Sequence, residues 1–339
     1  MASITSADVA REAGLSRATV SYVLNNTPGQ TIPERTRRRV LEAAERLGYV
    51  AHPGARALRL GRSDAVLFPL GEVSMTYVFG HAVNACSAAL NRHGFTLVAD
   101  ATRYESPEAA ANAWLRLGPA AFIDLTLTID DPAVVRMVAA GIPRVAADLE
   151  VPPGLAAIDV VSLEARRLQF VHVAERGARR VVFAASPPLL TSGKWPRLGE
   201  RLESLAKELG LELAIEPVEQ TRDGVVDAVA RWVASARPPD AVCGDSDDLA
   251  LPILSALTAR GVDVPGDMLV IGVDDIPASR AMSPALSSVA VVVEQMGEAL
   301  AAGVRTAIEA PDSPARYAPP EFRIMCRDST NRRVLPLAT

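Results

Sequence analysis

Between residues 5 and 48, apolar residues recur at helical spacing in three short runs. Thr5, with an acid three residues later, can form a capping box, and Gly14 suits a left-handed turn at a helix end. Ser16 can cap a second helix, and a third extends from Pro33 to Gly48. The pattern predicts three helices, with apolar faces made of Val9, Ala10 and Ala13, then Val20, Val23 and Leu24, then Val40, Leu41, Ala44 and Leu47.

From residue 64 onward, short β-rich runs alternate with amphipathic helical stretches. The predicted strands are 65–70, 95–99, 120–125, 144–148, 180–185, 240–244 and 268–273. The predicted helices are 106–117, 131–140, 162–176, 197–209, 223–236 and 246–260. Strands separated by helices of this length indicate parallel sheets with right-handed crossovers. We therefore expect two similar α/β lobes, with a ligand bound at the carboxyl ends of strands in the cleft between them.

A helix, a glycine-containing turn and a second helix form the helix-turn-helix layout, whose second helix enters the major groove of DNA. In the second predicted helix, Arg17, Ala18 and Tyr22 lie opposite the apolar stripe and would face base edges. Arg17 can donate two parallel hydrogen bonds to guanine, and Ala18 can pack on a thymine methyl group. A capped surface helix without a ligand is the alternative. The short polar residues placed to reach phosphates are Ser16, Thr19 and Asn25.

The chain has 339 residues, too many for one ordinary hydrophobic core, so more than one folding unit is expected. Charge is divided unevenly along it. Residues 1–62 contain ten arginines and five acids, a net charge of +5, while the remainder carries −10. A basic head on an acidic body suggests that the head meets a polyanion such as nucleic acid. An arginine-rich helix face that is merely solvated would give the same count.

Other classes of protein find little support in the sequence. No run approaches the ~20 apolar residues that span a bilayer, and the N-terminus shows no secretory signal, so we expect a cytoplasmic protein. Cys86, Cys243 and Cys326 lie far apart without metal-site spacing, which predicts buried free thiols in a reducing compartment. There is no glycine-rich phosphate loop, and we expect no cofactor and no metal.

The segments TSADVAREAGLSRATVSYVLNN (5–26), ERTRRRVLEAAERLGYV (34–50) and GARALRLGRS (54–63) resemble the DNA-binding head and hinge of the LacI/GalR family of bacterial transcription repressors. The likeness continues to RDST at 327–330 and covers nearly the whole chain. It implies an all-α helix-turn-helix head (1–50), a hinge helix and linker (51–62), and a periplasmic-binding-protein-like body of two doubly wound parallel-sheet lobes. The implied lobes are 63–161 with 291–320 and 162–290 with 321–331, followed by a tail at 332–339.

The resemblance further implies that residues 52–60 fold into a hinge helix only on the operator, in a dimer. Leu58 would wedge into the minor groove at the centre of a palindromic site, with Ala55 and Arg56 packing and anchoring the helix. Gly54 costs about 1 kcal/mol relative to alanine, so we expect a hinge that is less helical off DNA. Tyr22 stands where many relatives carry arginine, so the half-site should differ there. The candidate DNA-binding residues are Thr5, Ser16, Arg17, Ala18, Thr19, Ser21, Tyr22, Asn25, Arg37, Ala55, Arg56 and Leu58.

Two acidic motifs, GDSDD (244–248) and GVDD (272–275), directly follow predicted strands. Acids in this position could hold a metal, act as an acid/base pair, bind a ligand or cap helices, and no histidine or cysteine joins them. The resemblance implies that Asp247 serves the effector cleft with Ser246 beside it. It also implies that Asp274 accepts hydrogen bonds from effector hydroxyl groups.

Further effector-binding candidates come from the same resemblance. Arg197 falls where the family's effector-clamping arginine lies and could pair with Asp274 or hold a ligand oxygen, although it could equally be a surface residue. Asp148 resembles another pocket acid, and Trp195 could stack on an effector or pack internally. In the expected loop 72–79, the residues placed to face the cleft are Ser74, Tyr77 and Phe79.

The pocket departs from the family pattern at SSVAVVVEQMG (287–297), where Ala290 and Val291 replace the usual arginine and glutamine. Fewer polar groups make a less polar or aromatic effector more plausible than usual, although sugars are the commonest class in the family. The sequence does not name the effector, its sign of action, the operator or the regulated genes.

Taken together, these features predict a sequence-specific transcriptional regulator that represses as a homodimer on a palindromic DNA operator, under control of a small-molecule effector. The effector could instead act as a corepressor, which would order the hinge and strengthen DNA binding. The nine residues after RDST contain no heptads, which favours a dimer over a tetramer. A solute-binding protein without DNA function is the alternative, disfavoured by the basic head and the missing signal. An enzyme is a third, for which we expect no turnover, and no membrane partner is expected.

Overall fold

The computed structural model describes residues 4–24, 29–49, 62–70, 77–124, 127, 129–146, 156–158, 163–191, 195–310, 316–317 and 320–331. The chain divides into two compact units, Met1–Asp64 and Ala65–Thr339. No helix in these ranges is long and apolar enough to cross a membrane.

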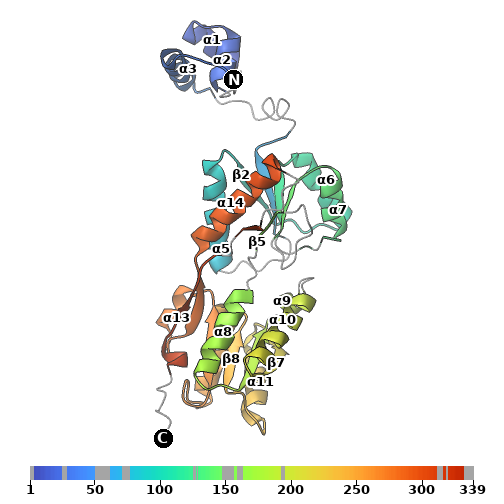
Figure 1. Ribbon diagram of the computed structural model, residues 1–339, viewed down its shortest axis with the longest axis vertical. Coiled ribbons are helices and arrows are strands. Elements are labelled where there is room, and N and C mark those ends of the chain that lie inside the picture. The colour runs from blue at the N-terminus through green and yellow to red at the C-terminus, as the bar shows by residue number, and fades with distance from the viewer. Residues whose placement is uncertain are drawn as a thin grey trace. The chain divides into compact units, whose positions relative to one another are not determined.

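The first unit contains the three predicted helices, α1 (Ser6–Ala13), α2 (Arg17–Leu24) and α3 (Glu34–Leu47) (Figure 1). The capping box is present, since the Thr5 amide donates to Asp8 Oδ2 at 2.9 Å. Gly14 and Gly48 end α1 and α3 with φ of 60° and 63°, where a side chain would be strained. At the start of α2, the Thr19 amide donates to Ser16 Oγ at 3.1 Å, which confirms the predicted cap.

Eight small or β-branched residues form the core of this unit, and one predicted member is wrong. Leu41 is 50% exposed, and Ala43 is buried in its place. Positions 40, 43, 44 and 47 follow the spacing of one helical face, and position 41 lies about 100° away from 40 around the helix. The buried core residues are Val9, Ala10, Ala13, Val20, Val23, Val40, Ala43 and Ala44.

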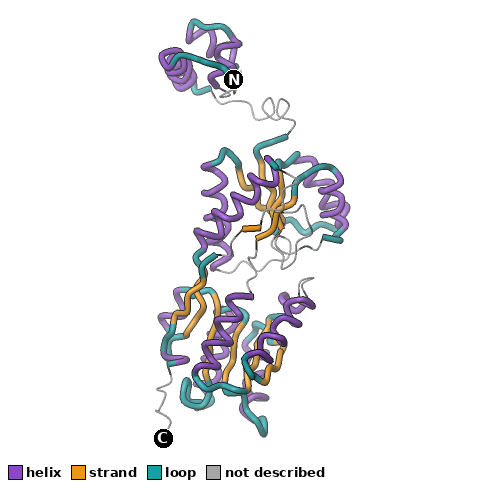
Figure 2. The backbone as a smooth tube through the Cα atoms, in the orientation of Figure 1, coloured by secondary structure: helices purple, strands orange, loops and turns teal. Residues whose placement is uncertain are grey.

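The second unit contains two six-stranded sheets, each flanked by helices (Figure 2). We call the first sheet with its helices the first lobe. Its strands are β1 (Ala65–Pro69), β2 (Thr96–Asp100), β3 (Ala121–Asp124), β4 (Arg144–Ala146), β5 (Ala156–Ile158) and β11 (Arg316–Tyr317), all parallel in the order β11-β5-β4-β3-β1-β2. Helices α5 (Tyr77–Arg92) and α14 (Val293–Glu309) lie side by side, as do α6 (Pro107–Leu117) and α7 (Pro132–Ala139) (Figure 1). The first pair shares one hydrophobic cluster and the second pair another.

The second lobe consists of the other sheet and its helices. Its strands are β6 (Arg180–Ala185), β7 (Glu212–Pro217), β8 (Ala241–Gly244), β9 (Leu269–Val273), β10 (Ser287–Val291) and β12 (Phe322–Met325), in the order β12-β10-β9-β8-β6-β7. Only the β10–β12 pairing is antiparallel among these. The helices are α8 (Leu163–Glu175), α9 (Pro187–Thr191), α10 (Trp195–Glu208), α11 (Arg222–Ala234), α12 (Asp247–Ala259) and α13 (Pro277–Ala281), with a short 3₁₀ turn at Asp328–Thr330.

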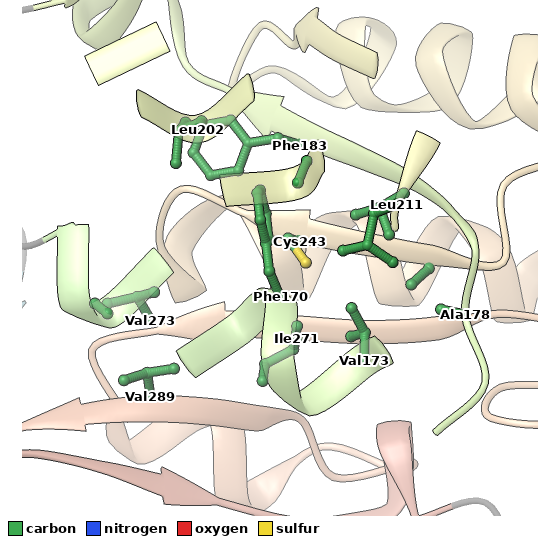
Figure 3. Close-up of a cluster of buried hydrophobic side chains, with 14 of the residues drawn as sticks. Phe170, Val173, Ala178, Phe183, Leu202, Leu211, Cys243, Ile271, Val273 and Val289 are labelled. Atoms are coloured by element: carbon green, nitrogen blue, oxygen red, sulfur yellow. The ribbon is translucent and has the colours of Figure 1, made fainter. Parts of the chain in front are cut away.

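Alternate residues of each central strand fill two different cores. In β6, Phe183 faces α8 and α10, where it meets Phe170 edge-on in the cluster of Figure 3. Its neighbour Val182 belongs to the cluster that contains Trp232 of α11 and Leu249 of α12. Strands buried on both faces read as continuous apolar runs, which is why these central strands could be predicted.

The seven predicted strands and six predicted helices are all present, but several elements were not foreseen. Strands β5, β7, β10, β11 and β12 and helices α5, α9, α13 and α14 are additional. The thiol prediction is also partly wrong, because Cys326 is exposed just beyond β12. Cys86 and Cys243 are buried as predicted, and burial raises the pKa of the Cys86 thiol to about 12.

The RDST segment ties the end of the described chain to the second sheet. The Ser329 hydroxyl donates to the Val270 carbonyl at 2.6 Å and accepts from the Ser287 amide at 2.8 Å. The Thr330 hydroxyl lies 2.7 Å from both Ser287 Oγ and His172 Nε2. Burial lowers the pKa of His172 to about 4, so this imidazole is neutral at physiological pH. The motif therefore has a structural role in the second lobe.

A buried ion pair closes the carboxyl end of β3 in the first lobe. Arg144 and Asp124 are each 1% exposed at the side chain, and Arg144 Nε donates to Asp124 Oδ2 at 2.9 Å. Both ions also bind the backbone of Leu127, whose amide donates to Asp124 and whose carbonyl accepts from Arg144. Removing one partner leaves an uncompensated buried charge.

We therefore expect Arg144→Met to lower the free energy of unfolding of the full chain by about 3–5 kcal/mol. Urea denaturation followed by tryptophan fluorescence measures this, since Trp114 lies in the same lobe. The matched control is Arg237→Met, whose partner Glu212 is exposed, and which should cost less than about 1 kcal/mol. Equal losses for the two variants would contradict the assignment.

Candidate DNA interface and ligand site

The outer face of α2 presents the residues expected to read DNA bases. Arg17, Ala18 and Tyr22 are exposed, whereas Val20 and Val23 on the same helix are buried. These orientations agree with the sequence analysis, and the DNA contacts themselves stay predictions.

The other DNA-binding candidates in the head fall into two groups. Ser16 and Thr5 are exposed and already serve as helix caps, the Thr5 hydroxyl donating to Asp8. Thr19, Ser21 and Arg37 are half-buried. Sequence reasoning did not single out Arg35 and Arg38, both exposed on α3, although the arginine run at 37–39 was a visible signal. The candidates outside the described residues are Asn25, Ala55, Arg56 and Leu58.

In the second lobe, the fold brings the two acidic motifs to one edge of the sheet. Asp245 and Asp247 follow β8, and Asp274 and Asp275 follow β9. Because β8 and β9 are parallel neighbours, their carboxyl ends meet at the same edge. This edge, between Asp245 and Asp275, is the candidate ligand site.

Asp247 is fully buried and holds three elements together. Its Oδ2 accepts from the Ile276 amide at 3.0 Å and from Ser279 Oγ at 2.6 Å, and its Oδ1 accepts from Ser288 Oγ at 2.7 Å. Burial raises the pKa of Asp247 to about 6, an effect that these hydrogen bonds partly offset. A Cβ at Gly272 would lie 2.0 Å from Asp247 Oδ1, so glycine is required there. Direct effector binding by Asp247 does not fit this geometry, because its carboxylate is already engaged inside the lobe.

Asp274 and Asp275 lie in the left-handed region of backbone space, with φ of 110° and 50°. Such conformations cost about 1–3 kcal/mol each and persist only where the surroundings impose them. Here the Asp274 amide donates to the Val289 carbonyl at 2.8 Å, and the Asp275 amide donates to Ser288 Oγ at 2.9 Å. The Asp275 carboxylate pairs with Arg280 at 2.7 Å and with Arg327.

The Asp274 carboxyl group accepts no hydrogen bond from any residue whose placement is described. Burial raises its pKa to about 8, the nearby Asp247 charge adds to the rise, and Arg166 opposes it. A desolvated carboxyl group with unused acceptor capacity is suited to bind a ligand that brings its own donors.

Arg166 of α8 is a residue of this edge that sequence reasoning missed. Its guanidinium carbon lies 5.5 Å from the centre of the Phe183 ring, and its charge faces Asp245 and Asp274. Burial lowers the pKa of Arg166. Gln169, one turn along the helix, donates to the carbonyls of Gly244, Ile271 and Gly272 at 2.9–3.3 Å, which fixes α8 over the strand ends. Two polar residues on the inner side of a helix were the available signal.

Arg197 and Trp195 of α10 do not take the places expected for them. Arg197 is exposed and makes no ion pair with Asp274, so the expected pairing is wrong. The reason is that Leu198 and Gly199, not Arg197, occupy the inner face of α10. Trp195 is half-buried against the second-lobe core, its ring 3.6 Å from where a Cβ of Gly199 would be. These contacts favour the packing interpretation.

Ser246 begins α12 and binds its neighbour rather than standing free. Its hydroxyl donates to Asp245 Oδ1 at 3.0 Å, and the other Asp245 oxygen accepts from the amide and hydroxyl of Ser186. Within the described ranges, no three His, Cys, Asp or Glu side chains are grouped to hold a metal ion.

In the first lobe, the expected loop 72–79 overlaps helix α5, which starts at Tyr77. Phe79 packs against the core, its ring 5.9 Å from that of Phe68, because the first turn of α5 turns it inward. Tyr77 is 48% exposed and lies beside His81, with ring centres 4.4 Å apart. The candidates Ser74 and Asp148 lie outside the described residues.

Comparison with known proteins decides the family. Residues 5–52 match the model of the bacterial regulatory proteins of the lacI family, and residues 170–330 match the model of periplasmic binding protein-like domains. The chain is a LacI-family transcriptional regulator. It combines a DNA-binding helix-turn-helix head with an effector-binding domain of two α/β lobes, and the family is one of regulators rather than enzymes.

Similar proteins support this assignment along the chain. The regulator CelR of Thermobifida fusca is 29% identical over 305 residues, which cover 86% of this LacI-family regulator and 88% of CelR. The regulator GalR of Escherichia coli is 29% identical over 290 residues, covering 83% and 82%. A solved CelR–cellobiose complex has a TM-score of 0.68 at 26% identity, covering 96% and 99%. A lac repressor dimer bound to operator and an anti-inducer has the same fold, with a TM-score of 0.79 at 20% identity over 97% and 99%.

The state of Asp274 gives a pH test of the site. Its folded pKa of about 8 lies above the ~4 of an unfolded aspartate, so its contribution to stability is full below pH ~4 and lost as pH rises through 8. Relative to wild type, Asp274→Asn should therefore gain free energy of unfolding by more than about 1 kcal/mol between pH 5 and pH 8. Asparagine tolerates the left-handed backbone, which keeps the comparison clean. Urea titrations at three pH values measure the difference; a difference that stays constant with pH contradicts the burial of this carboxyl group.

Proposed function

We propose that this LacI-family regulator is a repressor that binds a palindromic operator as a homodimer under the control of a small-molecule effector. The observation that carries the proposal is the exposed face of α2, where Arg17, Ala18 and Tyr22 are held out by two buried valines. A short anchored helix of this kind can lie in the major groove with its outer face on base edges. The structurally similar lac repressor is a dimer on its operator, which supports the same assembly here.

In this proposal, the head recognises one half-site and the hinge recognises the centre. Arg17 donates two hydrogen bonds to a guanine, Ala18 packs on a thymine methyl group, and Tyr22 reads a base pair without bidentate contact. Leu58 inserts into the minor groove at the centre, supported by Ala55 and Arg56. The family likeness supports the hinge assignment, since these three residues lie outside the described structure.

We assign the effector domain as a first lobe of 63–161 with 292–320 and a second lobe of 162–291 with 321–331; the boundary expected at 291 moves by one residue because Val291 is the last residue of β10. The pairing of β11 with β5 and of β12 with β10 supports this division, because the chain returns to each sheet after α14. An effector in the cleft between the lobes acts only through different affinities for the DNA-binding and DNA-free states. The complex of the related CelR with cellobiose supports a small-molecule effector.

Selection of bound duplexes from random DNA by the purified protein, at two salt concentrations, tests this function. We expect a palindrome with a flexible pyrimidine–purine step at its centre, since an inserted leucine kinks such steps at least cost. Its enrichment should survive the higher salt, while non-specific binding, which depends on phosphate charge alone, should weaken steeply. Recovery of only salt-sensitive, sequence-blind binding would contradict the proposal.

The residue assignment has its own test at Arg17. Arg17→Ala should weaken operator binding by about 1–3 kcal/mol and relax the preference at one base pair per half-site. Binding of operators with each base replaced, measured by fluorescence anisotropy, resolves that position. Arg11→Ala is the matched control, an exposed arginine of α1 with the same change in charge, and should leave base preference unchanged. A uniform weakening across all sequences would make Arg17 a phosphate-binding residue instead.

A further inference from the structure

Arg166 and Asp274 are two polar side chains at the candidate ligand site, and neither is satisfied by the part of the chain that the structure describes. Arg166 Nη1 donates one long hydrogen bond of 3.5 Å to Gln169 Oε1, and no described carboxylate lies within ion-pair distance of its guanidinium. The Asp274 carboxyl group accepts no hydrogen bond there either. Partly buried polar groups left in this state cost free energy unless a ligand or water completes them.

Packing, not a charge partner, sets the position of Arg166. Its guanidinium lies over the Phe183 ring, which belongs to the close-packed second-lobe core of Figure 3. The three hydrogen bonds from Gln169 to the ends of β8 and β9 fix the helix that carries it. A guanidinium in cation–π contact with an aromatic ring keeps its N–H donors available, so this one is held in place for a planar acceptor.

Apart from Asp248, which is exposed in the first turn of α12, the neighbouring charges are already engaged. Asp245 accepts from Ser186 and Ser246, and Asp247 accepts from two serine hydroxyls and a backbone amide. On the basic side, Arg280 and Arg327 are both held by Asp275. Arg166 and Asp274 are therefore the pair left to bind a ligand at this edge.

We propose that Arg166 binds a carboxylate of the effector while Asp274 binds an adjacent hydroxyl group, so that the effector is a small hydroxy acid rather than a neutral sugar. The inference rests on the proposed function in one respect, because it takes the effector to occupy this edge. A carboxylate matches the planar fork of arginine with two parallel hydrogen bonds.

Charge balance selects a carboxylate over a phosphate. The groups that act most strongly on Asp274 are one cation, Arg166, and three carboxylates, Asp245, Asp247 and Asp248. A phosphate monoester carries −1.5 to −2 charges at about pH 7 and would need further cations in this acidic setting. The aliphatic Ala290 and Val291 at the end of β10 offer no additional charge for a second anionic group.

Isothermal titration of the full-length protein without DNA tests the proposal. The probes are D-gluconate and D-galacturonate, their neutral counterparts D-glucose and D-galactose, and D-glucose 6-phosphate, in a buffer free of carboxylates. We expect at least one acid to bind at least about tenfold more tightly than its neutral counterpart and than the phosphate, since hydrogen bonds between ionised groups are stronger than those between neutral groups.

Variants on α8 separate the role of Arg166 from general charge effects. Arg166→Met keeps the packing volume and should weaken binding of the acid by about 10- to 100-fold, while Arg166→Lys should recover only part of it. The matched control is Arg167→Met, the next residue, which is exposed and paired with Glu164 and should bind the acid like wild type. Thermal denaturation of the unliganded variants checks that each is folded.

Three results would overturn the inference: tighter or equal binding of the neutral sugars, undiminished binding of the acid by folded Arg166→Met, or no binding of either acid. These outcomes are independent of DNA. Acid binding in a protein that selects no operator would leave this inference standing and remove the repressor function. An operator released by a neutral sugar would do the reverse.

Discussion

The buried carboxylate of Asp247 is the interaction on which the ligand edge of the second lobe depends. One side chain accepts hydrogen bonds from Ile276, Ser279 and Ser288, and so joins α12 to α13 and β10. Its close approach leaves no room for a side chain at residue 272, near the end of the strand that leads to Asp274. A carboxylate with three donors tolerates burial because its charge is shared among them, whereas removing those donors would leave it uncompensated. These hydrogen bonds from the Asp247 carboxylate fix the segment after β9, where Asp274 and Asp275 have positive φ angles.

The acids of the two motifs differ in what their carboxyl groups contact. Of the five acids, Asp245 and Asp247 are satisfied within the lobe, Asp275 holds Arg327 of the RDST segment, and Asp248 is exposed to solvent. Asp274 is the one that is largely shielded from water and accepts no hydrogen bond from the described residues. Arg166 is the corresponding unused donor on the opposite side of the edge. The unliganded protein is less stable than it would be if Arg166 and Asp274 had full sets of hydrogen-bond partners. Such groups are where a ligand gains the most from binding.

The head achieves its function with a much smaller core. In the described part of the head, eight buried residues, none larger than valine, form the core between three helices, with larger residues such as Leu24 and Tyr49 partly buried against it. The caps at Thr5, Ser16, Gly14 and Gly48 complete the helix ends. Because so little surface is buried, most side chains of α2 and α3 remain outside and available to a partner. The two units therefore offer a partner different kinds of group. The head offers exposed side chains on α2 and α3, and the second lobe offers Arg166 and Asp274, which are partly buried and have few hydrogen-bond partners.

The sequence by itself determined the local elements and the family. Capping residues, glycine stops and apolar runs depend on neighbours in the chain, so the three head helices and most of the inner strands followed from spacing alone, although the inner strands β5 and β10 did not. It missed edge strands such as β7 and β12, whose half-exposed residues carry a weaker signal, and it placed Leu41 on the wrong face of α3. Only the tertiary structure decided which acids are occupied and that Arg166, not Arg197, faces Asp274, because the acids and the arginine come from segments far apart in the chain.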